Sequence, residues 1–156
     1  MADARKRGAR MVVVDPICSH AAAKADEWIP IIPGTDGALG LGVANVMVNE
    51  LGIYDAEYLK KGTNAPYLVA EDGHYVRDAA TEKPLVWDAG DGAAKAYDDE
   101  TIRDDALEGS YEVDGKKCRP AFELVKEHLK KYPADKVGEI TGIPAETVRR
   151  FAKEFG

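Results

Sequence analysis

The feature that most restricts the fold is the run Met11-Val12-Val13-Val14, which is followed at once by Asp15-Pro16. Valine is β-branched and favours strands, and a continuous apolar run predicts a parallel strand covered on both faces. Proline cannot continue a central ladder, so the predicted strand ends at Asp15. A strand of this kind needs a layer on each side, which favours an α/β fold.

The residues that follow continue this pattern in alternation. Residues 19–26 predict a short helix, and residues 28–32 predict a short strand near a sheet edge, because Pro30 interrupts them. Residues 36–51 are apolar on nearly every side, which is typical of a buried helix, and Gly52 provides its C-cap. The order β-α-β-α predicts an α/β fold with a Rossmann-like layered sheet and flanking helices.

The rest of the chain changes character twice. Residues 64–118 predict a β-rich excursion with two hairpins, one of which turns at Asp114-Gly115. Residues 119–156 return to helices and complete the domain. We therefore expect one domain with a ligand-binding α/β segment at 1–63, a hairpin-rich insertion at 64–118 and a helical segment at 119–156.

Composition excludes several classes of protein. The 156 residues carry a net charge of −7, which argues against nucleic acid as a partner, including at the helix-turn-helix-like turn of residues 141–144. No apolar run approaches the roughly 20 residues that a membrane helix needs, and the polar start does not resemble a secretory signal. The compartment stays unknown. Cys18 and Cys118 lie far apart without any CxxC, so no iron–sulfur or zinc site is expected in this chain. The sequence permits a disulfide between them but does not require one, and the favoured interpretation is that both are ordinary core or surface residues.

Two acids mark a candidate binding site. Parallel strands end at the same edge of a sheet, so Asp15 and the turn Gly34-Thr35-Asp36 are expected to share one crevice. A carboxylate there can accept from a ribose diol or from both donors of a guanine edge. Gly34 permits a close backbone approach, and Thr35 adds a hydroxyl and an amide donor near a helix N-terminus.

The competing interpretation of these residues is structural. Thr35 or Asp36 is a good helix N-cap, worth about 1 kcal/mol, and Asp15-Pro16 is an ordinary strand exit. No GxGxxG or P-loop motif is present. A free-standing nucleotide-binding enzyme would need a base, and the nearest histidine, His20, is more typical of a solvated helix start. His74 and His128 have similar structural explanations, so no catalytic and no metal-ligating residue is expected.

A longer pattern joins these pieces. The chain has a strand ending in Asp15-Pro16, then Ser19, Ala25-Asp26-Glu27-Trp28 and Pro33-Gly34-Thr35-Asp36-Gly37-Ala38-Leu39, and it ends with Thr141-Gly142-Ile143-Pro144 and a helix. This pattern resembles the molybdopterin oxidoreductases of the dimethyl sulfoxide reductase family. The segments at 65–69 and 86–88 are similar to the branch of that family that includes acetylene hydratase.

The resemblance implies a cofactor and a site. The cofactor is bis(molybdopterin guanine dinucleotide) with molybdenum or tungsten, one guanosine end of which this segment would bind. Asp36 would take the guanine edge and Asp15 the guanine or the ribose, while Ile17 replaces an arginine that many members have after Asp-Pro. The residues implied to line this site are Asp15, Pro16, Ile17, Cys18 and Ser19 on one side and Gly34, Thr35 and Asp36 on the other.

The chain is several times shorter than catalytic subunits of that family. We expect a portion of such a subunit, inactive in isolation, whose main partner is the rest of the parent protein. The resemblance allows an iron–sulfur cluster elsewhere in the parent, and it allows a further partner in the form of an electron-transfer iron–sulfur subunit. The alternative is a non-catalytic α/β interaction module that keeps the motif without a bound cofactor.

Overall fold

The computed structural model describes residues 2–156, which form two compact units. Unit 1 consists of Met1–Ile53 and Leu129–Gly156, and unit 2 is the intervening segment Tyr54–His128. Each unit has its own cluster of buried apolar side chains. Unit 1 therefore brings together the two ends of the chain, which carry the motifs quoted above.

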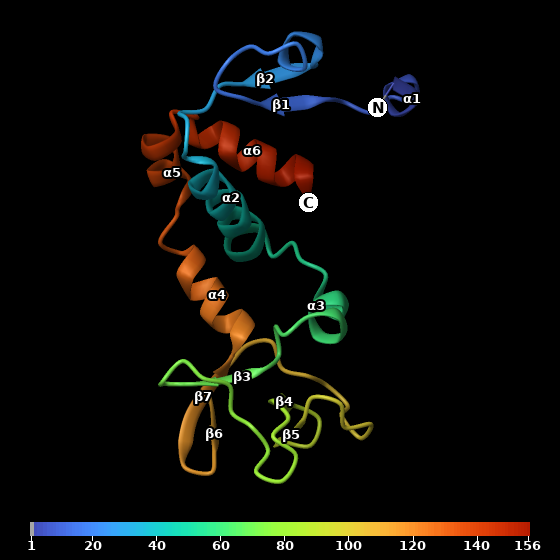
Figure 1. Cartoon of the computed structure of the whole chain (residues 1–156), viewed down its shortest axis with the longest axis vertical. Coiled ribbons are helices and arrows are strands. Elements are labelled where there is room, and N and C mark those ends of the chain that lie inside the picture. The colour runs from blue at the N-terminus through green and yellow to red at the C-terminus, as the bar shows by residue number, and fades with distance from the viewer. Residues whose placement is uncertain (1) are drawn as a thin grey trace. The chain divides into compact units, whose positions relative to one another are not determined.

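Unit 1 begins with helix α1 (Ala2–Lys6), after which β1 (Val12–Val14) pairs in parallel with β2 (Glu27–Ile29), as Figure 1 shows. Val12 lies opposite Glu27 and Val14 opposite Ile29. The three valines of β1 are partly buried. The predicted parallel strand is confirmed. Asp15, a residue of the candidate site, follows it directly.

Two predicted elements of unit 1 are shorter than expected. The helix predicted at 19–26 is a single 3-10 turn, η1 (Ala22–Lys24), because a segment this short gains too few hydrogen bonds to offset helix nucleation. The strand predicted at 28–32 ends at Ile29. Pro30 follows it directly and has no N–H to donate to a ladder.

The helices of unit 1 form its core. The long helix predicted at 36–51 is confirmed as α2 (Asp36–Asn45) continuing into a π-helical segment, η2 (Val46–Leu51), and Gly52 ends it with a φ of 66°. The C-terminal helices are α5 (Ala134–Thr141) and α6 (Ala145–Phe155). The buried core comprises Ile29, Ile31, Leu39, Val43, Val46, Ala134, Val137, Ile143, Val148 and Ala152.

Helices α2 and α5 approach closely at Gly42. A Cβ added at Gly42 would lie 2.5 Å from Val137 Cγ2, and valine has little rotamer freedom to move away. We expect Gly42→Ala to lower the free energy of unfolding by about 1–3 kcal/mol, although alanine is the better helix former. Gly40→Ala on the exposed side of α2 meets no atom within 4 Å and should instead stabilise the chain by up to about 1 kcal/mol. Urea unfolding of both variants measures the difference, and equal effects would contradict this packing.

Unit 2 is rich in antiparallel strands. The predicted hairpin at Asp114-Gly115 is confirmed, and the hairpin after Leu68 is formed by β3 and the bridge between Val69 and Tyr75. Strand order is β3-β7-β6 in one sheet and β4-β5 in another. The elements are α3 (Ala56–Gly62), β3 (Leu68–Ala70), β4 (Leu85–Asp88), β5 (Ala93–Ala96), β6 (Tyr111–Val113), β7 (Lys116–Pro120) and α4 (Ala121–Leu129).

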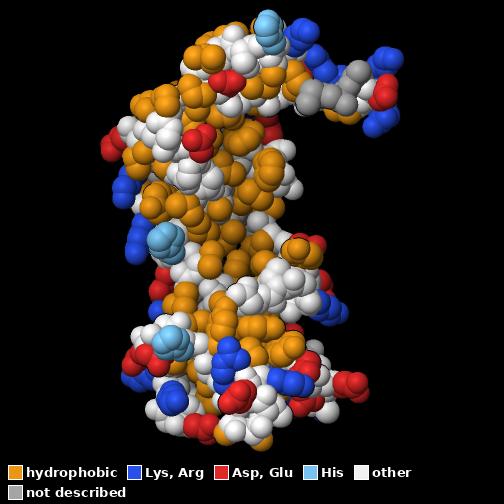
Figure 2. Space-filling model, viewed as in Figure 1, with side chains coloured by type: hydrophobic (Ala, Val, Ile, Leu, Met, Phe, Trp, Pro, Cys, Tyr) orange, Lys and Arg blue, Asp and Glu red, His pale blue; other side chains and the backbone are white. Residues whose placement is uncertain are grey.

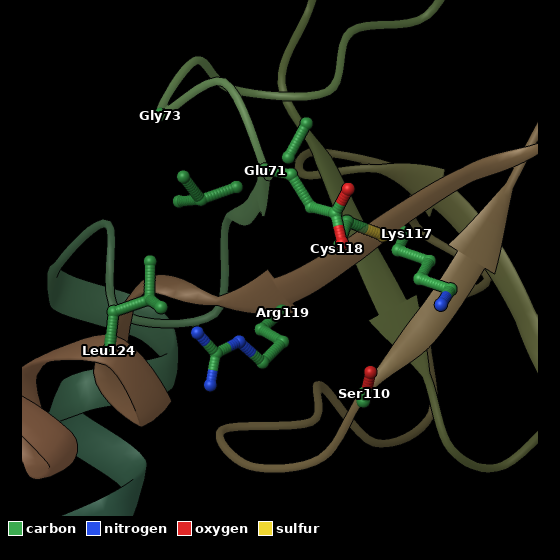
Figure 3. Close-up of a pocket in the computed structure, with 9 residues that line it drawn as sticks. Glu71, Gly73, Ser110, Lys117, Cys118, Arg119 and Leu124 are labelled. Atoms are coloured by element: carbon green, nitrogen blue, oxygen red, sulfur yellow. The ribbon is translucent and has the colours of Figure 1, made fainter.

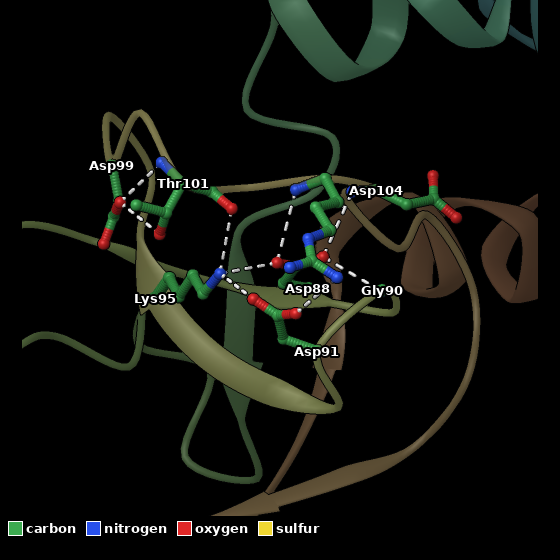
Figure 4. Close-up of polar contacts among 8 residues, drawn as sticks. Asp88, Gly90, Asp91, Lys95, Asp99, Thr101 and Asp104 are labelled. Carbon is green, nitrogen blue, oxygen red and sulfur yellow. Dashed lines mark hydrogen bonds and ion pairs between the residues drawn. The ribbon is translucent and has the colours of Figure 1, made fainter.

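A fully buried carboxylate, that of Asp88 at the end of β4, organises the acidic loops of unit 2 (Figure 4). Asp88 Oδ2 accepts from Lys95 Nζ at 2.7 Å and from the Arg103 amide at 3.3 Å. Asp88 Oδ1 accepts from the amides of Gly90 at 3.0 Å and Asp104 at 3.1 Å. These donors lower the pKa of Asp88, with the Lys95 ammonium as the largest cause, against the opposing effect of burial.

The mixed α/β fold, the β-rich middle and the helical C-terminal segment are confirmed. The parallel pair β1-β2 is the only parallel sheet in residues 2–156. The predicted segment boundaries at residues 63 and 118, and the extension of the parallel pair into a Rossmann-like sheet, stay predictions.

Candidate functional site

The two predicted segments emerge at the same edge of the parallel pair. Asp15 directly follows β1, and its amide donates to the Ile29 carbonyl at the end of β2 at 3.3 Å. The chain then leaves β2 through Pro30 and reaches Gly34-Thr35-Asp36 at the start of α2 (Figure 1). Asp15 therefore lies at the carboxyl end of β1, and Gly34-Thr35-Asp36 follow β2 along the chain, while the expectation that the two segments share one crevice stays a prediction.

The loop after β1 uses half of the Asp15 carboxylate for its own geometry. Asp15 Oδ1 accepts from the Ile17 amide at 3.1 Å, and the Asp15 carbonyl accepts from Trp28 Nε1 at 2.8 Å. The Ile17 carbonyl accepts from the Ser19 amide at 2.8 Å. The loop is thus fixed, while Oδ2 of Asp15 has no hydrogen bond or ion pair with the residues that the structure describes.

The remaining predicted residues of this loop differ in their exposure. Pro16, Ile17 and Cys18 are exposed, and Ile17 keeps 70% of its surface. Ser19 is half-buried and its Oγ accepts from the Ala22 amide at 3.4 Å. Ser19 therefore serves the turn at η1, and Pro16, Ile17 and Cys18 are the exposed residues of this loop.

The turn before α2 is built around Gly34 and Thr35. Gly34 has a φ of 79°, a conformation that favours glycine. The space around it is open, since an added Cβ would meet no atom within 4 Å. Thr35 stands at the N-cap position, but its hydroxyl donates backwards to the Ile32 carbonyl at 2.7 Å and makes no cap hydrogen bond. Its amide also donates to Ile32, at 3.3 Å. Thr35 thus stands at the predicted N-cap position, but the predicted side-chain cap is not formed, and its backbone (φ −107°, ψ 11°) lies outside the extended region usual for a capping residue.

Asp36 differs from Asp15 in having an unengaged carboxylate. It is the first residue of α2 and is exposed. Neither of its oxygens has a hydrogen bond or an ion pair within the described part of the chain. Its position in the first helical turn stabilises the negative charge through the helix dipole. Asp36 can therefore offer two parallel acceptor oxygens to one ligand.

An apolar groove of about 360 Å³ begins beside Asp36 and runs between α2 and α6. Figure 2 shows apolar side chains gathered over these helices. Phe155 keeps 74% of its surface exposed there. Asp36 is the one charged residue in the lining, which otherwise comprises Leu39, Gly40, Val43, Ala44, Met47, Phe151 and Phe155.

Residues of the Ala-Asp-x-Trp motif have supporting roles that sequence reasoning did not assign. Asp26 Oδ2 accepts from the Met11 amide at 2.8 Å, which lowers the pKa of Asp26 and fixes the start of β1. Glu27 forms ion pairs with Arg10 and with Arg150 of α6. Trp28 holds the Asp15 carbonyl, as described above. The Ala-Asp-x-Trp motif was the sequence signal that could have indicated these roles, because its residues lie immediately before and within β2.

The Thr-Gly-x-Pro motif also supports the site. Thr141 is fully buried, and its carbonyl accepts from the Ile32 amide at 3.0 Å. Its hydroxyl donates to the Val137 carbonyl at 2.7 Å and accepts from the Ile143 amide at 3.2 Å. The turn between α5 and α6 thus fixes the same Ile32 that closes the Thr35 turn, which gives this motif a structural role in the site.

Other cavities lie in unit 2 and contain none of the predicted site residues. One of about 550 Å³ lies against β7, with Glu71, Ser110, Lys117 and Arg119 around it (Figure 3). Arg119 is paired with Glu127 at 2.7 Å. Cys118 in its lining is a buried core residue, and burial raises the pKa of its thiol.

No cluster of metal-ligating side chains lies beside the predicted residues in the described chain. Within residues 2–156, no group of three or more His, Cys, Asp or Glu side chains is arranged to hold a metal ion. His20, His74 and His128 are exposed. Among the described helices, none combines the length and apolar character needed to cross a membrane.

Comparison with known proteins gives consistent relatives. No family model matches the chain. A sulfite dehydrogenase subunit of Allochromatium vinosum is 37% identical over 168 residues, which cover 97% of this chain and 17% of the relative. The alpha chain of perchlorate reductase from Dechloromonas aromatica is 32% identical over 197 residues, covering 99% of this chain and 21% of the relative. The chain thus spans about a fifth of the length of these curated relatives.

A solved structure agrees with the sequence relatives. Acetylene hydratase from Pelobacter acetylenicus superposes with a TM-score of 0.54 at 29% identity, over 97% of this chain and 13% of that chain. The fold of this chain therefore corresponds to a segment of that longer chain. The chain is homologous to catalytic subunits of the dimethyl sulfoxide reductase family of molybdopterin oxidoreductases.

Proposed function

We propose that this chain is the part of a molybdenum or tungsten oxidoreductase catalytic subunit that binds one guanosine end of bis(molybdopterin guanine dinucleotide). The observation that carries the proposal is the unengaged carboxylate of Asp36 at the start of α2, in the segment that follows β2, the strand whose partner β1 leads into Asp15. The homologous catalytic subunits support the same cofactor class. When bound, the metal–pterin group would supply the redox chemistry.

The hydrogen bonds of the two acids support a division of their roles. A guanine edge presents two parallel donors and needs two free acceptor oxygens, which Asp36 has. Asp15 has already engaged Oδ1 with the Ile17 amide, so its remaining oxygen suits a single ribose hydroxyl. We therefore assign the guanine edge to Asp36 and the ribose to Asp15.

The neighbouring residues fit a nucleotide without adding charge. In this proposal the exposed residues Pro16, Ile17 and Cys18 would form one wall with Ser19 behind them, and Gly34 and Thr35 would form the other. Ile17 offers an apolar side chain where an arginine would make a charged contact. Thr35 contributes an acceptor, because its hydroxyl proton is donated to Ile32.

The proposal extends to the whole protein. The rest of the parent protein would complete the cofactor site, and this chain in isolation would have no oxidoreductase activity. Further proposed components are an iron–sulfur cluster in the parent and an electron-transfer iron–sulfur subunit, and this chain supplies none of their ligands.

The test is the cofactor content of the full-length polypeptide that carries this sequence. Plasma mass spectrometry should find molybdenum or tungsten, and acid hydrolysis should release a pair of guanosine monophosphates for each metal atom. A folded full-length protein that contains neither metal nor guanosine monophosphate would instead support the interaction-module alternative.

A further inference from the structure

The apolar face of helix α6 extends beyond the core that it covers. Apolar residues with the i, i+3, i+4, i+7 spacing of one helix face occur along α6, namely Val148, Phe151, Ala152 and Phe155. Val148 and Ala152 are buried in the core of unit 1, and Phe151 packs against that core. Phe155 continues the same face by a further turn and keeps 74% of its surface exposed. One end of this face is therefore left uncovered by the described residues.

The exposed ring of Phe155 lines the apolar groove between α2 and α6, whose volume is about 360 Å³. Its centroid lies 6.1 Å from that of Phe151, at an interplanar angle of 43°. On the other wall, Gly40 is exposed, and a Cβ added there would meet no atom within 4 Å. Ala44 lies one turn further along α2 and is half-buried. Aromatic rings on one wall and small residues on the other thus leave space that the described chain does not fill.

The chemistry of the lining restricts what can fill this space. Asp36 is the one charged residue among the described residues of the lining, and the others carry no hydroxyl, amide or charged side chain. A polar occupant would lose water there without gaining a hydrogen-bond partner. Aliphatic or aromatic side chains would instead remove apolar surface from water on both sides. The groove therefore fits apolar side chains of a polypeptide.

The relatives indicate where such side chains come from. The segment homologous to this chain makes up 17% of the sulfite dehydrogenase subunit and 13% of the acetylene hydratase chain. Most of each of those polypeptides lies outside the region that corresponds to this chain. A segment of the same polypeptide acts at an effective concentration on the order of 1 mM, which a second copy of the protein reaches only at that total concentration. An occupant from the same polypeptide is therefore favoured over a second copy.

We propose that, in the full-length protein, an apolar segment of the same polypeptide from outside residues 1–156 packs into the groove between α2 and α6. The inference rests on the proposed function only for placing this chain within a larger catalytic subunit. The segment would cover Phe155 and lie against Gly40, where the missing side chain permits close approach. Since α2 begins at Asp36, the same contact would fix the helix that carries the proposed guanine-binding residue.

Photo-crosslinking of the full-length protein tests the proposal. Phe155→p-benzoylphenylalanine and, in a second sample, Met47→p-benzoylphenylalanine place the photoreactive group on the two sides of the groove. Gel electrophoresis separates crosslinks within one copy from those between copies, and mass spectrometry of the peptides identifies the joined residues. We expect both positions to crosslink to one segment outside residues 1–156 of the same copy.

Lys153→p-benzoylphenylalanine is the matched control. Lys153 is an exposed residue of α6 that lies about 200° around the helix from Phe155, so it should not crosslink to that segment. Crosslinks only between copies, crosslinks confined to residues 1–156, or equal capture of the segment from Lys153 would overturn the proposal.

Oxidation of the unsubstituted full-length protein by hydroxyl radicals measures the covering of Phe155 without any variant. We expect Phe155 to react at least about fivefold more slowly in the native protein than after unfolding in urea, because the core of an interface excludes water. A native rate close to the unfolded rate, as an exposed ring would show, would contradict the proposal.

Metal and guanosine monophosphate content, measured on the same samples, separates this proposal from that of cofactor binding. Crosslinks from the groove in a protein that contains neither would support the packing of the segment and reject the cofactor assignment. A loaded protein without these crosslinks, in which Phe155 reacts as an exposed ring, would reject only the packing of the segment.

Discussion

Replacing Asp36 with alanine in the full-length protein is expected to lower the content of bound metal and guanosine monophosphate at least about tenfold. The substitution removes both acceptors for the guanine edge, and a hydrogen bond to a charged group is worth about 1.5–3 kcal/mol. Metal analysis and chromatography of the released nucleotide, each per mole of folded protein, measure the loss.

Glu146→Ala is the matched control for Asp36→Ala. Glu146 is also an exposed acid in the first turn of a unit 1 helix, α6, so its removal costs a similar helix-dipole interaction. We expect unchanged metal and nucleotide content in this variant. Equal losses in the two variants would show that Asp36 acts through helix stability, and wild-type content in both would refute its assignment to guanine.

Asp88→Ala is expected to destabilise unit 2 strongly, lowering its Tm by on the order of 10 °C. The substitution leaves Lys95 without its buried partner and three loop amides without an acceptor. Thermal unfolding followed by the fluorescence of Trp87, which lies in β4 and stacks on Tyr111 at 4.4 Å, reports on this unit. Asp99→Ala removes an exposed acid whose side chain accepts from Thr101 and should lower the Tm by no more than about 3 °C.

The lowered pKa of Asp88 predicts how the stability of unit 2 changes at low pH. The pKa of Asp88 is lower in the folded chain than in the unfolded chain, so its stabilisation is complete above the unfolded value of about 4. That stabilisation is lost as the pH falls further towards the folded value. We expect the Tm of the wild-type unit to fall below about pH 4 and the fall to be shallower in Asp88→Ala. Parallel pH profiles would contradict this role.

Residue preferences within short segments were sufficient to predict much of the fold. The β-branched run before Asp15 predicted β1, the apolar segment 36–51 predicted α2 and its continuation, and Gly52 predicted the helix end. The turn at Asp114-Gly115 predicted the β6-β7 hairpin. These features depend on backbone preferences within a few residues, which are readable without tertiary contacts.

The rest depends on contacts that sequence does not display. The backbone of Thr35 lies outside the extended region usual for a capping residue and the expected cap is not formed, and the Thr141 carbonyl accepts from the Ile32 amide of a distant segment. The Asp88 loop is likewise a product of folding. For the candidate site, the sequence pattern predicted that Asp15 and Asp36 are binding residues, and the family resemblance indicated the ligand. Only the structure showed that the Asp36 carboxylate is free of hydrogen bonds whereas one oxygen of Asp15 accepts from the Ile17 amide.

The most direct test is a crystal structure of the cofactor-loaded full-length protein. We predict that both oxygens of Asp36 accept from the ring N–H and the exocyclic amine of one guanine, with the attached ribose within hydrogen-bond distance of Asp15. A guanine bound elsewhere, or an Asp36 carboxylate directed to solvent beside a loaded cofactor, would contradict it.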